Sequence, residues 1–106
     1  MTRVTKHATK RIRTRLGLPK HVSEKNADKA FRNGIRHKET TGSLHRYMDF
    51  LFFQNQNANN IRIYHNFVYI FAGKTLITVF DLPNKYKKAA ARLQDTARRG
   101  EIMHEI

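Results

Sequence analysis

Histidine and arginine recur at one-turn spacing near the start of the chain. His7, Arg11 and Arg15 follow one another at intervals of four residues, which places them along one side of a helix. An imidazole can transfer a proton near neutral pH, and a guanidinium can hold a phosphate and stabilise developing negative charge. Two interpretations stay open. His7 and Arg11 act together on one phosphate, or these long side chains simply extend from the edge of a buried stripe into solvent.

The element that carries these side chains is predicted to be a helix over about residues 5–16. Thr5 can cap its first turn, and Gly17 can end it in a left-handed conformation. A second helix is predicted over about 19–33, because Pro19 suits a first helical turn and Gly34 stands where a left-handed residue would end the helix. The first helix would bury one apolar stripe, made of Ala8, Ile12 and Leu16.

The rest of the chain predicts a small antiparallel sheet between further helices. Three apolar segments, at 61–64, 67–72 and 76–80, are separated by the turn-prone pairs His65-Asn66 and Gly73-Lys74. Segment 34–42 is expected to be a loop or short extended segment, 44–54 a helix with a strand as its rival, and 84–99 a helix. We therefore expect one α+β domain over 1–106, with N-terminal helices packed on a three-stranded β-meander and a C-terminal helix. Tails 1–4 and 101–106 are expected to be loosely ordered.

Alternation along the strands divides the apolar segments into two faces. The more aliphatic face should lie under the helices, and it consists of Ile61, Ile63, Val68, Ile70, Ile77 and Val79. The opposite face mixes aromatic rings with one guanidinium and one hydroxyl, and it consists of Arg62, Tyr64, Phe67, Tyr69, Phe71, Leu76, Thr78 and Phe80. Such a face suits single-stranded nucleic acid, because bases stack on aromatic rings and phosphates pair with arginine. A second core layer beneath another helix is the equal alternative.

Charge is concentrated in the first half of the chain and favours a polyanionic partner. Residues 1–46 hold 13 basic and 3 acidic side chains, so that they contribute +10 of the formal net charge of +13. Nucleic acid, with RNA favoured over DNA, is therefore the expected partner, and an acidic protein is another candidate. The expected nucleic-acid contacts are Lys10, Arg13, Arg15, Arg62 and Tyr69. The absence of cysteine and of a long apolar run predicts a cytoplasmic protein without a membrane partner.

Metal and cofactor sites are not expected from the motifs. The six histidines form no His-x-His or His-x-x-x-His pair, and we expect no carboxylate at ligand spacing beside them, so neither a zinc site nor another cofactor is predicted. Asp49 is a lone acid in an apolar segment and is expected to pair with Arg46 or with a neighbouring helix.

The order of these motifs resembles that of a known family. His7-Ala8-x-x-Arg11-Ile12-x-x-Arg15, a second helix, and strands ending in Ile77-Thr78-Val79 resemble small proteins of the barnase/colicin/RelE-type ribonuclease-toxin superfamily. The resemblance covers about residues 5–83. It implies an RNA site on the sheet and first helix, and metal-independent cleavage by attack of a ribose 2′-hydroxyl on the adjacent phosphate. By this resemblance His7 is the acid or base, Arg11 the phosphate clamp and Thr78 a polar site residue, with Tyr64 and Arg62 assisting.

The sequence leaves three functions open. The first is an RNA-binding protein of ribonuclease-toxin type, active or inactive as an endoribonuclease, for which an acidic protein such as an antitoxin or a host complex is a further candidate partner. The second is a non-catalytic protein of phage or mobile-element origin that binds nucleic acid or inhibits a host complex that handles nucleic acid. The third is a DNA-binding helix-turn-helix formed by the first two helices.

Overall fold

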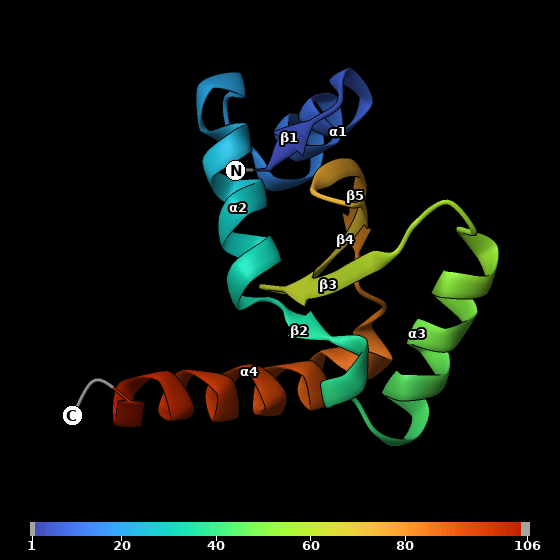
Figure 1. Ribbon diagram of the computed structural model, residues 1–106, viewed down its shortest axis with the longest axis vertical. Helices are drawn as coiled ribbons and strands as arrows, with labels where there is room; N and C mark the ends of the chain where they lie inside the picture. The colour runs from blue at the N-terminus through green and yellow to red at the C-terminus, as the bar shows by residue number, and fades with distance from the viewer. Residues whose placement is uncertain (1, 105–106) are drawn as a thin grey trace.

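A five-stranded mixed sheet runs through the centre of the computed structural model, with helices on both of its faces (Figure 1). The structure describes the backbone of residues 2–104 and the side chains of residues 2–95. The elements follow one another as β1 (Arg3–Val4), α1 (Lys6–Arg11), a π-helical turn (Ile12–Leu16), a 3-10 turn (Lys20–Val22), α2 (Ser23–Asn33), β2 (Ile35–Arg36), a 3-10 turn (His37–Glu39), α3 (Gly42–Gln54), β3 (Asn60–Tyr64), β4 (Phe67–Ala72), β5 (Thr75–Asp81) and α4 (Asn84–His104).

The predicted three-stranded meander forms the middle of the sheet. β3, β4 and β5 pair antiparallel in sequence order, and the first hairpin turns at His65 and Asn66, which both have positive φ, as expected for a two-residue turn. The α+β class is confirmed, but the expectation of about three strands is wrong, since the order across the sheet is β1-β5-β4-β3-β2.

Two very short strands account for the difference. β1 pairs parallel with β5 through Arg3↔Thr75 and Val4↔Leu76, so residues 3–4 are part of the sheet and not a loose tail. β2 pairs antiparallel with β3 through Ile35↔Ile63 and Arg36↔Arg62. A strand of two residues has no alternation of its own, and it becomes visible only once its neighbour in the sheet is known.

The helices lie close to their predicted ranges. Thr5 caps α1, and Gly17 ends the first helical segment with a φ of 70°, both as predicted. Gly34 ends α2 for a different reason, because its φ of −68° is not left-handed. A Cβ at this position would lie 2.5 Å from the carbonyl oxygen of Ala30 and 2.8 Å from the Cβ of Arg62, so glycine is required by the close approach of α2 to β3.

Both faces of the sheet are buried. One face packs its aliphatic residues against α3 and α4, with Met48, Leu51 and Ala90 in the same cluster as Ile61 and Ile63. The other face packs against α1 and α2, where Tyr69 and Phe71 are buried with Ala8, Ile12 and Ala27. The prediction of helices on only one face is therefore wrong, and the alternative of a second core layer is confirmed.

A bulge explains two errors in the predicted faces, at Val79 and at Phe80, which pairs with Val68 and packs in the cluster under α3 and α4. The register between β4 and β5 shifts at Ile70/Phe71, so that Thr78 pairs with Ile70 but Leu76 pairs with Phe71. Val79, which pairs with Tyr69, therefore joins the cluster under α1 and α2. Strict alternation had placed Val79 with the aliphatic residues on the other face.

The C-terminal helix is longer than predicted. α4 extends to His104, so that part of the tail expected to be loosely ordered, 101–106, is helical, and 105–106 lie outside the described residues. No helix in the part of the chain that the structure describes is both long enough and apolar enough to span a membrane.

Candidate functional site

α1 begins directly against β5, just past the two residues at which β5 pairs with β1. The backbone N–H of Thr5 donates to the carbonyl of Leu76 at 3.1 Å, and the Thr5 hydroxyl donates to the carbonyl of Ile77 at 3.2 Å. The same hydroxyl accepts from the N–H of Ala8 at 3.1 Å and so caps the helix. One threonine thus fixes both the start of α1 and its position on the strand that carries Thr78.

This anchoring brings three of the predicted catalytic residues together. The Nε2 of His7 lies 3.3 Å from the Thr78 hydroxyl and 3.4 Å from the Nε of Arg11, which donates to it. Because a guanidinium N–H can only donate, Nε2 is the acceptor, and the neutral ring then carries its proton on Nδ1. His7 is exposed, whereas Arg11 and Thr78 are partly buried. The site therefore gathers an imidazole, a hydroxyl and a guanidinium at the surface, with the imidazole lone pair hydrogen-bonded to the guanidinium.

Arg15 continues the same line of side chains along β5. Its guanidinium donates to the carboxylate of Asp81 at 2.9 Å, with the two side chains 34% and 60% exposed. Arg15 therefore remains at the surface, where an approaching phosphate can reach it. Its charge is partly neutralised by Asp81, a partner that sequence spacing gave no reason to expect.

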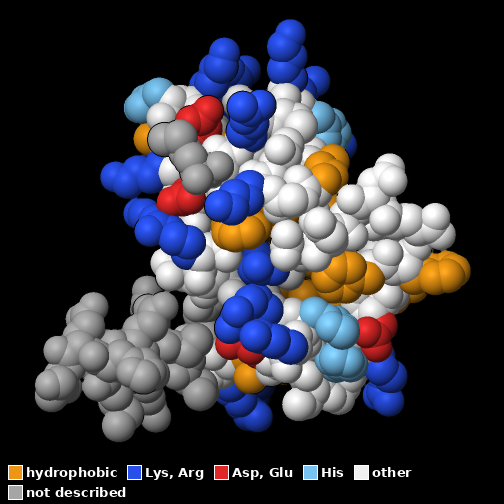
Figure 2. Space-filling model, in the orientation of Figure 1, with side chains coloured by type: hydrophobic (Ala, Val, Ile, Leu, Met, Phe, Trp, Pro, Cys, Tyr) orange, Lys and Arg blue, Asp and Glu red, His pale blue; other side chains and the backbone are white. Residues whose placement is uncertain are grey.

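The other flank of α1 forms a basic groove. This open groove of about 370 Å³ is lined by four basic side chains and two others, namely Lys6, Lys10, Arg13 and Lys20 with Val4 and Thr9. Lys10 and Arg13 were predicted as nucleic-acid contacts, whereas Lys6 and Lys20 were missed. Figure 2 shows Lys and Arg side chains projecting from the upper part of the molecule, where α1 and α2 lie. We name this feature the α1 groove.

Tyr69 is not part of any surface. Its side chain is 0% exposed, and its hydroxyl accepts a hydrogen bond from the Nδ2 of Asn26 at 3.1 Å. Burial raises the pKa of Tyr69 to about 12; the Asn26 hydrogen bond opposes this shift, and Tyr64 adds to it. A ring with no exposed surface cannot stack on a base, so the assignment of Tyr69 to the nucleic-acid surface is wrong.

Arg62 holds α2 on the sheet. Its Nε donates to the carbonyl of Phe31 at 3.1 Å, and its guanidinium carbon lies 4.9 Å from the centroid of the Phe31 ring. Desolvation lowers the pKa of this half-buried group; Arg36 lowers it further, and Glu39 opposes the shift. The Arg62 guanidinium was expected to pair with phosphate, but in the structure it is bound to Phe31 in the last turn of α2.

Tyr64 is separated from the His7 cluster. It lies at the end of β3 opposite Phe67, and Phe67 in turn pairs with Asp81, not with Thr78. Tyr64 is therefore two strands away from β5, a distance of roughly 10 Å across the sheet. Its ring contacts His65 and Tyr69 at centroid distances of 4.0 and 6.3 Å. The structure thus brings His7, Arg11 and Thr78 together without Tyr64.

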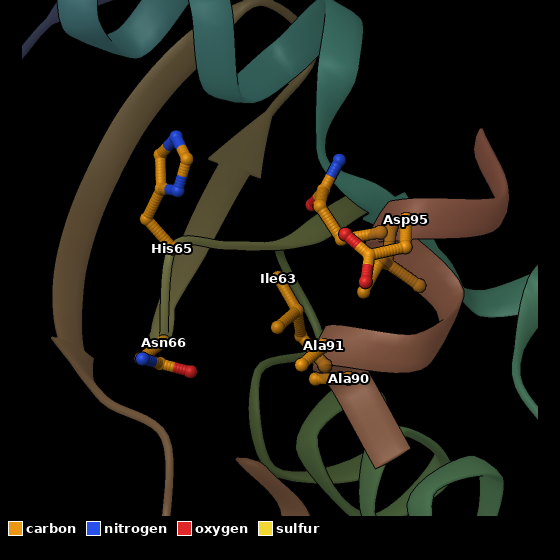
Figure 3. Close-up of a pocket in the computed structure, with 8 residues that line it drawn as sticks. Ile63, His65, Asn66, Ala90, Ala91 and Asp95 are labelled. Carbon is orange, nitrogen blue, oxygen red and sulfur yellow. The ribbon is translucent and has the colours of Figure 1, made fainter. Parts of the chain in front are cut away.

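A smaller cavity lies between the first hairpin and α4. It measures about 190 Å³ and is lined in part by Ile63 and Gln94. Figure 3 shows His65 and Asn66 on one side of it and Ala90, Ala91 and Asp95 on the other. The side-chain Nε2 of Gln94 donates to the backbone carbonyl of Asn33, the last residue of α2. This hydrogen bond joins α4 to α2. The cavity does not include the residues of the His7 cluster or of the α1 groove.

A second cluster of side chains, made of two histidines and one aspartate, was not predicted from the sequence. Asp49 was expected to pair with Arg46 or with a neighbouring helix. Its two carboxylate oxygens instead face the Nε2 atoms of His37, from the turn before α3, and of His45, from α3 itself, at 2.5 and 3.7 Å. The expectation that no carboxylate stands at ligand spacing is wrong, because His45 and Asp49 are separated by four residues on α3. That spacing was available in the sequence. The approach of His37 depends on the turn before α3 and was not.

Comparisons with protein-family models, with curated proteins and with solved structures found no match for this chain.

Proposed function

We propose that the protein binds RNA along α1 and cleaves it at the cluster formed by His7, Arg11 and Thr78. The observation that carries this proposal is the position of the His7 Nε2 lone pair between a guanidinium and a hydroxyl, 3.4 and 3.3 Å away. The three groups come from α1 and β5, and Thr5 fixes these two elements together. The proposal deepens what the resemblance to ribonuclease toxins implies for the same residues.

The chemistry follows from the three side chains. In the free protein the Nε2 lone pair of His7 accepts from Arg11. When Arg11 turns to the bound phosphate, Nε2 is released to accept the proton of a ribose 2′-hydroxyl, and that oxygen then attacks the adjacent phosphorus. Arg11 stabilises the negative charge that develops on the phosphate oxygens. The bond to the 5′-oxygen breaks, and this oxygen takes a proton from solvent. The products are a 2′,3′-cyclic phosphate and a 5′-hydroxyl end. Thr78 holds the imidazole in place through its hydrogen bond.

The α1 groove supplies binding next to this chemistry. Residues 6–16 contain five basic side chains and no acidic one, namely Lys6, Lys10, Arg11, Arg13 and Arg15. They divide between the two flanks of one helix, so a single strand that follows α1 meets positive charge on both sides. Neutralised phosphates release counterions, which favours binding of any sequence. Nucleic acid is therefore the proposed partner, and specificity would come from elsewhere.

Cleavage of an end-labelled single-stranded RNA in the presence of EDTA tests the proposal. The wild type should generate 2′,3′-cyclic phosphate ends without added metal, as expected for proton transfer to a side chain. His7→Ala should reduce the rate by ~10²–10⁴-fold with RNA affinity nearly unchanged. Arg11→Lys keeps the charge but loses the planar fork, so the rate should fall more than the affinity.

His21→Ala is the matched control, because His21 is exposed and belongs to neither histidine cluster. It should cleave as the wild type does. If the wild type releases no RNA fragments with or without divalent metal, or if His7→Ala cleaves at the wild-type rate, the catalytic part of the proposal is wrong.

One observation favours a non-catalytic protein as the second candidate. Phe50 and Phe53 of α3 are 50% and 76% exposed, the large hydrophobic side chains that stand out at the described surface. Exposed aromatic rings are typical of protein contacts. The protein would be an RNA-binding module if it binds RNA without cleaving it, and if this binding is lost when basic residues of α1 are substituted but is kept when Phe53 is substituted. Loss of a host-complex contact in Phe53→Ser would favour the inhibitor.

A further inference from the structure

Two imidazoles and a carboxylate meet at the start of α3, away from the residues assigned to RNA. His37 comes from the 3-10 turn His37–Glu39, and His45 and Asp49 are one turn apart on α3. One ligand atom from each of the three lies within 4.8 Å of the others. The two imidazole rings lie with their centroids 4.2 Å apart and are inclined by 30°, and Phe52 packs against His37 at 5.3 Å.

Thr40 determines which nitrogen of His45 is free. The Thr40 hydroxyl donates its one proton to the carbonyl of His37 at 2.6 Å. Its oxygen also lies 3.0 Å from the Nδ1 of His45, so Nδ1 must be the donor in that contact. The neutral His45 ring therefore carries its proton on Nδ1, and its Nε2 is unprotonated with a lone pair available to a ligand. Thr40 is 4% exposed, so this arrangement is protected from competing water.

The bare nitrogen faces a carboxylate oxygen. His45 Nε2 lies 3.7 Å from Asp49 Oδ2, and both atoms are acceptors, so a cation between them is favourable. In a tetrahedral zinc site, bonds of about 2.0–2.1 Å place neighbouring ligand atoms about 3.3 Å apart. The distance from His45 to Asp49 is close to that value. His37 Nε2 lies 2.5 Å from Asp49 Oδ1 and donates a hydrogen bond to it in the metal-free protein. A bound metal ion takes the place of this proton, which is released to solvent. The distance must then widen by about 0.8 Å, which side chains 36% and 55% exposed can accommodate.

We propose that His37, His45 and Asp49 form a site for a divalent transition-metal ion, with zinc as the ion that its donors suit. Two imidazole nitrogens and one carboxylate oxygen are the protein ligands of known three-ligand zinc sites, where water takes the fourth position. The partial exposure of the three side chains leaves room for that water. The Thr40 contact to His45 Nδ1 is the outer-shell hydrogen bond that such ligands commonly make.

The proposal is independent of RNA cleavage. The His7 cluster is built on α1 and β5, whereas the metal ligands are built on α3 and the turn before it. Cleavage is expected to persist in EDTA, and zinc binding is expected in protein free of RNA. Failure of one therefore does not affect the other.

The protein, without an affinity tag, is freed of metal with EDTA and then dialysed to remove the EDTA. Calorimetric titration of this protein with zinc chloride tests the site. The wild type should bind one zinc ion, and its melting temperature should rise in the presence of the metal. Asp49→Asn and His45→Ala should each weaken binding by at least about tenfold. Thr40→Val should weaken it by about 10–100-fold, because the outer-shell contact to His45 is lost. His21→Ala, the matched control, should bind as the wild type does.

Cobalt provides a second readout that does not depend on substitution. Co²⁺ added to the wild type should give the intense visible absorption of a four-coordinate site, and zinc should displace it. A wild type that binds no zinc at millimolar concentration would overturn the proposal. Equal zinc affinity in the wild type, Asp49→Asn and His45→Ala would overturn it as well.

Discussion

The two faces of the sheet differ in their side chains and in how positive charge is distributed along the helices that cover them. Under α1 and α2 the core is partly aromatic, with Tyr69 and Phe71 at its centre. Under α3 and α4 the sheet contributes aliphatic residues, Ile61 and Ile63 among them. Residues 6–16 carry five basic and no acidic side chains, and α2 carries three basic and two acidic ones. On the other face α3 carries one of each, Arg46 and Asp49, and the sequence of α4 holds six basic and two acidic residues. The density of unopposed positive charge in residues 6–16, and not the total for each layer, therefore sets the first face apart.

The burial of the aromatic face moves the proposed RNA surface from the sheet, where the sequence had suggested it, to the outside of the covering helices. Aromatic rings on a strand face suggested bases stacked on an open sheet, but α1 and α2 bury that face. What they leave exposed is their own basic outer surface and the His7 cluster at β5. The aromatic residues thus support α1 and α2 from beneath and are not part of the exposed surface that we propose for RNA.

Truncation of a ring in the aromatic layer should have the largest effect on stability. Phe71 is 0% exposed and meets Phe31 of α2 edge to face at 5.1 Å. Phe71→Ala should therefore reduce the free energy of unfolding by about 3–5 kcal/mol, as measured by urea denaturation. A loss below about 1 kcal/mol would show that α2 does not pack on this face. Phe53→Ala, at an exposed ring of α3, is the control.

Alkaline pH should weaken the same layer through Tyr69. The pKa of its hydroxyl is raised from 10.0 to about 12 in the folded state, so the folded protein holds this proton more tightly than the unfolded chain does. The resulting stability is complete below about pH 10 and is lost as pH rises toward 12, with a total of roughly 2–3 kcal/mol. Chemical denaturation of wild type and Tyr69→Phe across this range should show the extra loss in the wild type alone. Parallel curves would contradict the prediction.

Removal of the α1 cap should have a moderate effect. Thr5→Ala loses the contacts to Ala8 and to Ile77 and should reduce stability by about 1–2 kcal/mol. It should also slow RNA cleavage, because His7 is no longer held opposite Thr78. Thr41→Ala is a close control, since Thr41 precedes α3 without making a side-chain cap, and it should leave stability within about 0.5 kcal/mol of the wild type. Equal losses in the two variants would show that Thr5 is not a special anchor.

Neutralisation of Asp81 should have the smallest effect on the fold. The ion pair with Arg15 is largely exposed, so Asp81→Asn should change stability by less than about 1 kcal/mol. It should strengthen RNA binding by a few fold at low salt, because it frees Arg15 and removes a negative charge beside the site. Weaker binding in Asp81→Asn, measured by fluorescence anisotropy, would indicate that the RNA does not pass this end of β5.

The parts of the fold that have a clear pattern could be predicted from the sequence. Ala8, Ile12 and Leu16 gave the first helix, and alternation with two turn-prone pairs gave the central meander. The two-residue strands Arg3–Val4 and Ile35–Arg36 could not be found, because pairing with β5 and β3 defines them. The bulge before Thr78 was equally hidden, since it inverts alternation without any glycine or proline to mark it.

The candidate sites divide in the same way. His7 and Arg11 share a helix, and local spacing was enough to pair them, whereas Arg62 and Tyr69 were misassigned because their partners, Phe31 and Asn26, come from α2. His37 joins His45 and Asp49 only through the turn stabilised by Thr40. Contacts within one helix are thus predictable from sequence, and contacts between elements are not.

The most direct test of the RNA surface compares equal charge losses on the two layers. Lys10→Gln with Arg13→Gln removes two charges from the α1 groove, and Lys85→Gln with Lys88→Gln removes two exposed charges from α4. Affinity for a single-stranded RNA should be measured against salt for both double variants. The α1 variant should bind more weakly, with a slope of log affinity against log salt shallower by about 1.4, and the α4 variant should match the wild type. Equal losses in the two variants would contradict an RNA surface on α1.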